Sequence, residues 1–208
     1  MVVLCPLNGL STQWVSCAGR MRRTCLNPSS HLVVAHRKAS RGRMSWTDAC
    51  GETKKVCSVF FDGEEFWYTV WVVPDEVLAR LLPRGDLYIG FEELVGIVLA
   101  YTTFRRFLKG CLWTSFQDNM GVLLAVLKGS AGPTALDYNA VIGQFWLSLA
   151  LDQVGFQCHR VESAANASDQ PMRGRLDIVN RFRMRWVDPV VPDWVRSPFS
   201  FPDPFAAT

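Results

Sequence analysis

Three short segments in which apolar residues alternate follow one another closely in the first half of the chain. They run from Met44 to Cys50, from Val56 to Phe61 and from Glu65 to Val73. The dipeptide Asp62-Gly63, which joins the second segment to the third, is a strong signal for a tight hairpin turn. Residues 44 to 73 therefore predict an antiparallel meander of three strands.

The chain alternates between helix and strand patterns after this meander. A short helix is expected from Pro74, and a long apolar helix should follow it. The later elements are a helix from Ile89 to Leu108, a strand from Cys111 to Gln117, helices from Asn119 to Leu127 and from Leu136 to Gln153, and a strand from Phe156 to Val161. A right-handed crossover would bring the fourth strand back beside the first. We expect a mixed α/β sheet of five strands, three antiparallel and two parallel, flanked by helices.

The two ends of the chain differ in composition from its middle. Residues 1–43 carry seven basic residues and no acidic one, whereas the rest of the chain has 15 basic and 19 acidic residues. We interpret residues 1–43 as a basic N-terminal extension: an arm that grips phosphates, a leader from a truncated reading frame, or an organelle transit peptide. Residues 44–186 form the predicted domain, and residues 187–208 are a Pro-rich tail expected to be extended. Arg173 to Arg185 is a second basic segment, of helical composition.

The hydrophobic content and the cysteines bound the class of protein. The longest apolar stretch, in the helix from Phe91 to Phe107, is interrupted by charges and is shorter than the roughly 20 residues of a membrane span. No membrane association is expected. The seven cysteines are an odd number and form no C-x-x-C pair, which favours buried free thiols and a reducing intracellular compartment, cytoplasm or nucleus.

Four acidic residues lie in or next to predicted strands and in an apolar helix, where a carboxylate is unusual. Asp48 lies in the first predicted strand, Asp118 ends the fourth, and Asp169 follows the last. Glu93 lies in the long apolar helix, where an unpaired charge is costly unless a metal ion neutralises it. Because the first and fourth strands should be neighbours, Asp48 and Asp118 should be neighbours too. This constellation is typical of a two-metal nuclease.

The segments around these carboxylates resemble a known family. They are Thr47-Asp48-Ala49, Glu93-Leu94, Asp118-Asn119 and the run Asn166-Ala167-Ser168-Asp169-Gln170-Pro171-Met172-Arg173. Together they resemble the ribonuclease H domain of retroelements that carry a reverse transcriptase, and most closely that of DIRS-like tyrosine-recombinase elements. The resemblance covers roughly residues 44 to 173, and the last segment departs from the family pattern at Ser168 and Met172.

The resemblance implies a ribonuclease H-like fold and hydrolysis of the RNA strand of RNA–DNA hybrids by two Mg²⁺ ions, with Mn²⁺ as a substitute. It implies that Asp48 bridges both ions, that Glu93 and Asp118 hold the ion beside the leaving group, and that Asp169 holds the ion that activates water. Glu93 rather than Glu92 matches the family pattern. The implied partners are an RNA–DNA hybrid or other nucleic acid, and a reverse transcriptase polyprotein to which the chain would belong.

Each site residue also has a structural interpretation, and the chain as a whole has two alternative ones. An Asp at the end of a strand is more often a cap or turn residue than a ligand. Asn119 and Arg173 are candidates for binding substrate, although the start of a helix favours Asn in any case. A catalytically silent nucleic-acid-binding domain with the same fold is the first alternative, and a retroelement remnant without selected function is the second.

Overall fold

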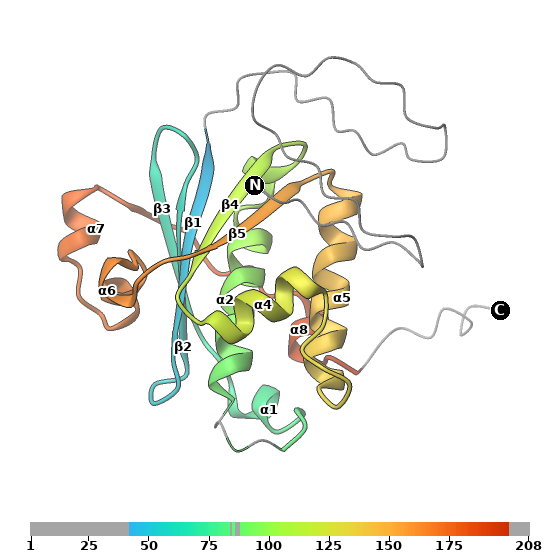
Figure 1. Cartoon of the computed structure of the whole chain (residues 1–208). Helices are drawn as coiled ribbons and strands as arrows, with labels where there is room; N and C mark the ends of the chain where they lie inside the picture. Colours follow the sequence, from blue (N-terminus) through green and yellow to red (C-terminus); the bar gives the residue numbers. More distant parts are fainter. Residues whose placement is uncertain (1–41, 84, 86–87, 200–208) are drawn as a thin grey trace, which may run out of the picture.

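The protein is built around one six-stranded sheet with helices on both faces (Figure 1). The computed structural model describes residues 42–83, 85 and 88–199. The strand order in the sheet is β5-β4-β1-β2-β3-β6. The strands are β1 Arg43–Cys50, β2 Lys55–Phe61, β3 Phe66–Val72, β4 Leu112–Gln117, β5 Gly155–Arg160 and β6 Arg185–Trp186.

The strand pairing confirms the predicted meander and the predicted crossover. Strand β2 is antiparallel to both β1 and β3, while β4 lies parallel to β1, and β5 parallel to β4. Gly63 at the hairpin has φ 101°, a conformation that glycine adopts without strain. The Asp62 carboxylate accepts hydrogen bonds from the backbone amides of Glu64 and Glu65 at 2.8 and 2.9 Å.

The prediction of five strands is wrong, because the chain adds a sixth after the basic segment. Arg173 to Arg185 does not form one helix. Helix α6 Asp169–Met172 ends before Gly174, which has φ 74°, and α7 Asp177–Arg181 ends before Arg183, which has φ 49°. These two left-handed residues redirect the chain, so that β6 pairs with the exposed edge of β3. A two-residue strand has no periodicity that a sequence could reveal.

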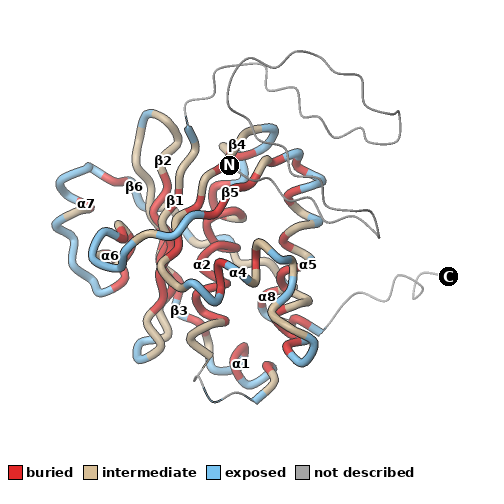
Figure 2. The backbone as a smooth tube through the Cα atoms, viewed as in Figure 1, coloured by how far each residue is buried: buried red, intermediate tan, exposed pale blue. Residues whose placement is uncertain are grey.

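Helices α2 Ile89–Thr103, α4 Met120–Lys128 and α5 Leu136–Leu151 cover one face of the sheet, and α6 and α7 lie against the other (Figure 1). The predicted long helix ends at Thr103, and the separate turn α3 Arg105–Leu108 follows. Helix α2 is apolar on nearly every side, and every residue from Phe91 to Tyr101 is buried (Figure 2). It is the centre of the core, as its composition predicted.

The described part of the C-terminal segment is packed rather than extended, so the predicted tail is wrong for residues 187–199. Helix α1 Asp75–Leu78 precedes α2 along the chain. In the C-terminal segment, helix α8 Asp193–Arg196 packs against α5. Val195 is completely buried, and the backbone amide of Val190 donates to Thr103 Oγ1 at 3.1 Å. Apolar residues between the prolines anchor this segment to the core.

The predicted basic extension, apart from residues 42 and 43, and residues 200–208 lie outside the described part of the chain. None of the helices in the described ranges has both the length and the apolar character needed to span a bilayer.

Helix α2 crosses the sheet at Gly96, and this close approach fixes where the start of the helix lies. A Cβ at Gly96 would lie 3.2 Å from Thr47 Cβ and 3.4 Å from Val56 Cγ1. The Gly96 carbonyl also accepts a hydrogen bond from Ser58 Oγ at 2.9 Å. The helix turn that carries Glu93 therefore lies directly over β1.

A matched pair of glycine substitutions tests this crossing. Gly143 lies in α5, and a Cβ added there would meet no atom within 4 Å. Gly143→Ala should stabilise the protein by about 1 kcal/mol through helix propensity. Gly96→Ala should lose that gain to overpacking, and Gly96→Val should destabilise by about 1–3 kcal/mol. Thermal melting measures the difference, and equal effects of alanine at both positions would contradict a close crossing.

Candidate metal centre

Three carboxylates from three separate elements meet at one edge of the sheet. Asp48 lies near the end of β1, Asp118 directly follows β4, and Glu93 lies in the first turns of α2. One carboxylate oxygen of each lies within 4.8 Å of those of the other two. The predicted convergence is therefore confirmed. Trp46 pairs with Phe116 in the parallel register, and two residues later each strand carries its aspartate.

The cluster of Asp48, Glu93 and Asp118 is largely buried and short of hydrogen-bond donors. Asp48 is 7% exposed and Glu93 is 6% exposed. Asp48 Oδ1 accepts from the Ala49 backbone amide at 3.0 Å, whereas Asp118 Oδ1 is buried with no hydrogen-bond partner among the described residues. Such an oxygen is costly to bury unless a cation satisfies it.

The electrostatics of the cluster also favour a cation. Burial, reinforced by the charge of Asp118, raises the pKa of Asp48 to about 7. Burial, reinforced by Asp48 and Asp118, raises the pKa of Glu93 to about 9. Carboxylate oxygens are the ligands that Mg²⁺ and Ca²⁺ prefer, and a divalent ion would relieve both burial and mutual repulsion. The donor set therefore fits a hard divalent metal ion.

Gln117 makes hydrogen bonds to two of the three acidic residues, and the sequence analysis missed it. Its Nε2 donates to Glu93 Oε2 at 3.0 Å and to the Glu93 carbonyl at 3.3 Å, while its Oε1 accepts from the Asp118 amide at 3.0 Å. Gln117 is completely buried. Its only signal in the sequence is a large polar residue at a buried position of β4, next to a candidate ligand.

Glu92 is buried like Glu93 but lies outside the cluster. Both its carboxylate oxygens lack a hydrogen-bond partner among the described residues, and burial raises its pKa to about 7, with Lys54 opposing the change. Helix geometry separates the two glutamates, because adjacent residues point about 100° apart. The structure thus places Glu93, and not Glu92, beside Asp48.

Asp169, the fourth predicted ligand, is not part of the cluster of mutually close ligand atoms. It lies at the start of α6, on the face of the sheet opposite α2, and its Oδ1 accepts from Arg173 Nε at 2.7 Å. Asp169 is still close enough to contribute to the raised pKa of Asp48, an effect that Arg173 opposes. The Asp169–Arg173 pair therefore borders the cluster without joining it.

Asn166 and Ser168 fasten the loop that carries Asp169 to the first strand. Asn166 Nδ2 donates to the Thr47 carbonyl at 2.9 Å, and Asn166 Oδ1 accepts from Ser168 Oγ at 2.6 Å. Both residues are buried. Ser168, one of the two departures from the family pattern, thus has a structural role, because it orients the asparagine that grips β1 next to Asp48.

The two predicted substrate-binding residues occupy different surroundings. Asn119 is the N-cap of α4, and its Oδ1 accepts from the Val122 amide at 3.2 Å. This is the structural role that the start of a helix favours. Arg173 is exposed, and its hydrogen bond to Asp169 raises its pKa further. Neither residue belongs to the cluster.

The raised pKa values predict how stability depends on pH in the absence of divalent metal. Ordinary carboxyl groups titrate near pH 4 when unfolded, so the folded protein holds more protons between about pH 4 and the values of about 7 for Asp48 and 9 for Glu93. Stability in EDTA should therefore fall as the pH rises through this range. Glu93→Gln should flatten the fall. Melting curves from pH 5 to 9 measure it, and an equally steep fall in Glu93→Gln would contradict the assignment.

No protein-family model matches the sequence, and no curated protein matches it significantly. The family resemblance of residues 44 to 173 therefore stays a prediction. The function has to be argued from the geometry and chemistry of the cluster itself.

Proposed function

We propose that this chain is a metal-dependent endonuclease with a ribonuclease H-like fold, which hydrolyses the RNA strand of RNA–DNA hybrids. The observation that carries the proposal is the convergence of Asp48, Glu93 and Asp118, from β1, α2 and β4, within 4.8 Å of one another. The parallel pairing of β1 with β4 and the close crossing of α2 support it, because both are needed to bring the carboxylates together.

Each residue of the cluster would have its own role in binding the metal. Two bound Mg²⁺ ions would stabilise the charge on the attacking and leaving oxygens of the phosphodiester. Asp48, whose raised pKa reflects the charges of both Asp118 and Asp169, would offer its carboxylate to the bound metal. Gln117 holds Glu93 by its Oε2, which leaves Oε1 as the ligand atom, and Asp118 presents its unpartnered Oδ1.

Asp169 would complete the set by exchanging its bond to Arg173 for the second ion. Asp169 begins α6, directly after a loop that Asn166 fastens to β1, and the exchange would be a change of its side-chain rotamer. Arg173 is exposed, and once released it would be positioned to bind a phosphate of the substrate.

The direct test is incubation with a labelled RNA–DNA hybrid in Mg²⁺, in Mn²⁺ and in EDTA, beside RNA–RNA and DNA–DNA duplexes of the same sequence. We expect cleavage of the RNA strand of the hybrid only, and only with metal. Preference for the hybrid would come from recognition of the 2′-hydroxyl across the minor groove. Cleavage of all three duplexes would assign a nuclease of another specificity.

One observation favours a second candidate, a catalytically silent nucleic-acid-binding domain with the same fold. Asp169 is paired with Arg173 at 2.7 Å and lies outside the cluster. If that pairing persists with metal present, the second ion would lack a ligand. The silent domain would bind the hybrid in Mg²⁺ without cleaving it, and Arg173→Gln would not create activity.

A further inference from the structure

A row of aromatic rings crosses the face of the sheet that carries α6 and α7. Trp46 on β1 stacks on Phe116 of β4, with ring centroids 5.3 Å apart and an interplanar angle of 16°. Phe116 is 6.2 Å from His159 on β5, and on the other side Trp46 is 6.4 Å from Phe66 on β3. Phe66 is in turn 5.1 Å from Phe182, which follows α7. We call these five residues the aromatic row.

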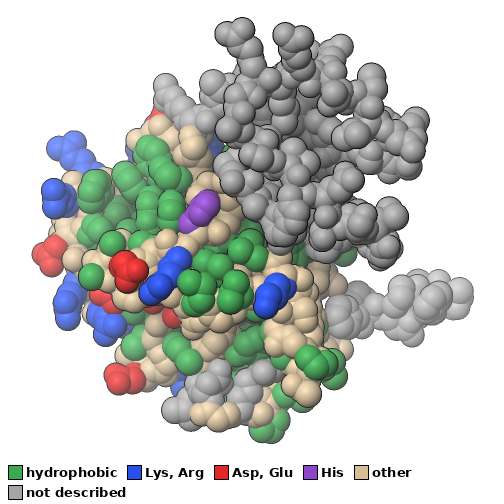
Figure 3. Space-filling model, in the orientation of Figure 1, with side chains coloured by type: hydrophobic (Ala, Val, Ile, Leu, Met, Phe, Trp, Pro, Cys, Tyr) green, Lys and Arg blue, Asp and Glu red, His purple; other side chains and the backbone are tan. Residues whose placement is uncertain are grey.

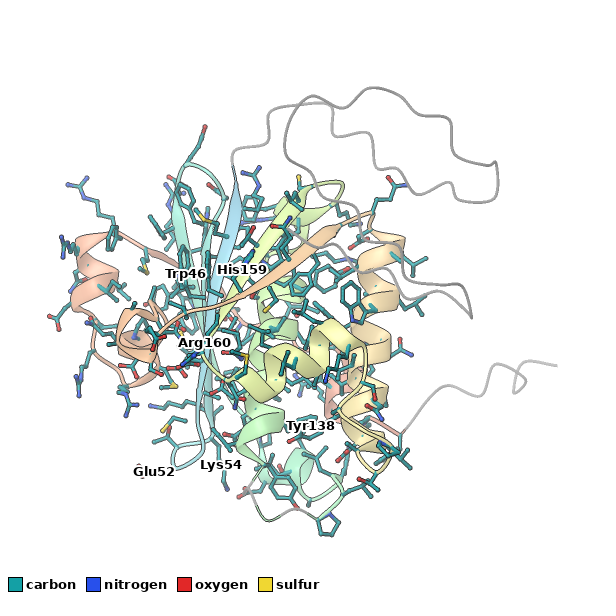
Figure 4. The ribbon with its side chains drawn as sticks, in the orientation of Figure 1. Trp46, Glu52, Lys54, Tyr138, His159 and Arg160 are labelled. Carbon is teal, nitrogen blue, oxygen red and sulfur yellow. The ribbon has the colours of Figure 1, made fainter. Side chains whose placement is uncertain are left out.

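The aromatic row remains open to solvent. Trp46, Phe116 and Phe66 are partly exposed, His159 is exposed, and Phe182 is 45% exposed. Figure 4 labels Trp46 and His159, which lie close together in the view although they belong to β1 and β5. His159 is thus a surface residue. Trp46 and Phe66 pack against the buried cluster that contains Cys57, Val59 and Met172, but each keeps part of its surface exposed.

The aromatic row lies beside the candidate metal centre. Trp46 precedes Asp48 by two residues on β1, and Phe116 precedes Asp118 by two residues at the end of β4. Side chains two residues apart on a strand share one face, about 7 Å from each other. The aromatic row crosses the strands, so the carboxylate cluster lies beside it, two residues further along β1 and β4.

Positive charge borders the aromatic row. Three exposed arginines of the segment from β5 to β6 are ion-paired: Arg160 with Glu162, Arg173 with Asp169, and Arg185 with Glu65. The other exposed arginines of this segment are Arg175, Arg181 and Arg183, and the Arg181 guanidinium lies 5.7 Å from the Phe182 ring centroid. The same segment holds three acidic residues, Glu162, Asp169 and Asp177. In Figure 3 hydrophobic side chains gather in the upper left, beside the one histidine in view, with Lys and Arg along the left edge.

We propose that the aromatic row binds unpaired, single-stranded nucleic acid, with bases adding to the stack of rings and phosphates facing the bordering arginines. Aromatic side chains beside a basic border are the combination that binds single strands without sequence preference. The exposed rings at the two ends, His159 and Phe182, let a base extend the row at either side. This activity goes beyond cleavage of a hybrid and does not depend on it.

The test uses the full chain, EDTA to prevent cleavage, and two fluorescent probes: a 12-nucleotide oligothymidylate and a 12-nucleotide oligouridylate. Fluorescence anisotropy at several salt concentrations gives the dissociation constant of each. Trp46→Ala should weaken binding roughly fivefold or more, whereas Trp46→Phe, which keeps a ring, should lose little. His159→Ala should also weaken binding, and because His159 is exposed the melting temperature should not change. This variant still tests the proposal if Trp46→Ala does not fold.

Two controls separate stacking from charge. Leu151→Ala removes an exposed apolar side chain, 74% exposed on α5, and should not change binding. Arg175→Gln should lower the slope of log affinity against log salt by about one, whereas Trp46→Ala should weaken binding with the slope unchanged.

Three results would overturn the proposal. The wild type could fail to bind either oligonucleotide at low salt. The ring variants could bind like the wild type while Arg175→Gln alone is weaker, which would make the contact purely electrostatic. Finally, sedimentation could show a dimer that Trp46→Ala dissociates, without any oligonucleotide binding, which would assign the aromatic row to a second copy of the chain.

Discussion

Asp118→Asn is expected to reduce metal-dependent hydrolysis of an RNA–DNA hybrid by at least about a hundredfold. The amide keeps the shape of the side chain but removes a negative charge from the proposed metal site, a change worth several kcal/mol in the transition state, and each 1.4 kcal/mol is tenfold in rate. Binding of the hybrid should persist, because the arginines proposed to bind phosphates are unchanged. Single-turnover cleavage and anisotropy with the same labelled hybrid measure the two effects.

A matched control is Asp193→Asn, which makes the same chemical change at an exposed position in α8. It should cleave at the wild-type rate. Asp169→Asn adds information that the first variant does not, because Asp169 is the proposed fourth ligand and is paired with Arg173. A loss as large as that of Asp118→Asn would mean that Asp169 joins the site during reaction. Wild-type activity in Asp118→Asn would refute the cluster as the catalytic centre.

The sheet could be predicted from the sequence largely because its strands carry their own signals. The meander is marked by period-two patterns and by Asp62-Gly63, and the position of β4 beside β1 follows from the handedness of crossovers. These two facts already place Asp48 near Asp118. Glu93 could be placed because a buried helix without polar faces leaves a glutamate few other reasons to be there.

The remaining features depend on tertiary contacts that leave little trace in the sequence. β6 is two residues long, and its partner β3 decides that it forms at all. Gln117 gains its role only when α2 brings Glu93 within 3.0 Å of its amide. The segment after Trp186 contains prolines that suggest an extended tail, but Val195 fills a place in the core that no local pattern announces.

The position of the Asp169 side chain at the candidate site also could not be predicted from the sequence. The sequence places it after the last long strand, and the Asn166 anchor brings it beside β1. The direction of its side chain is decided by Arg173, four residues later on the same turn. An i,i+4 pair forms whatever the function of the site, so order along the chain alone does not distinguish a ligand from a partner in an ion pair.

Mg²⁺ or Mn²⁺ should raise the melting temperature of the wild type, and the rise should grow with pH. A ligand at 100 times its dissociation constant stabilises the folded state by about 2.7 kcal/mol, which is roughly 5–10 °C for a chain of this size. Metal must displace the protons that burial holds on Asp48 and Glu93, whose pKa values are about 7 and 9. The rise should therefore be small at pH 5 and large at pH 8.

Variants of the cluster should change the melting temperature in a defined direction. In EDTA at pH 8, Asp118→Asn should melt above the wild type, because the amide removes a charge that repels the ionised Asp48, whose pKa is about 7. The same variant should gain much less from Mn²⁺. Asp193→Asn should behave like the wild type in both conditions, and sodium chloride at equal ionic strength should not reproduce the metal effect. Melting requires no turnover, so a metal-dependent rise in melting temperature without hybrid cleavage would indicate a domain that binds metal but is catalytically silent. If neither the rise nor cleavage were observed, metal binding would not explain why the three carboxylates are buried.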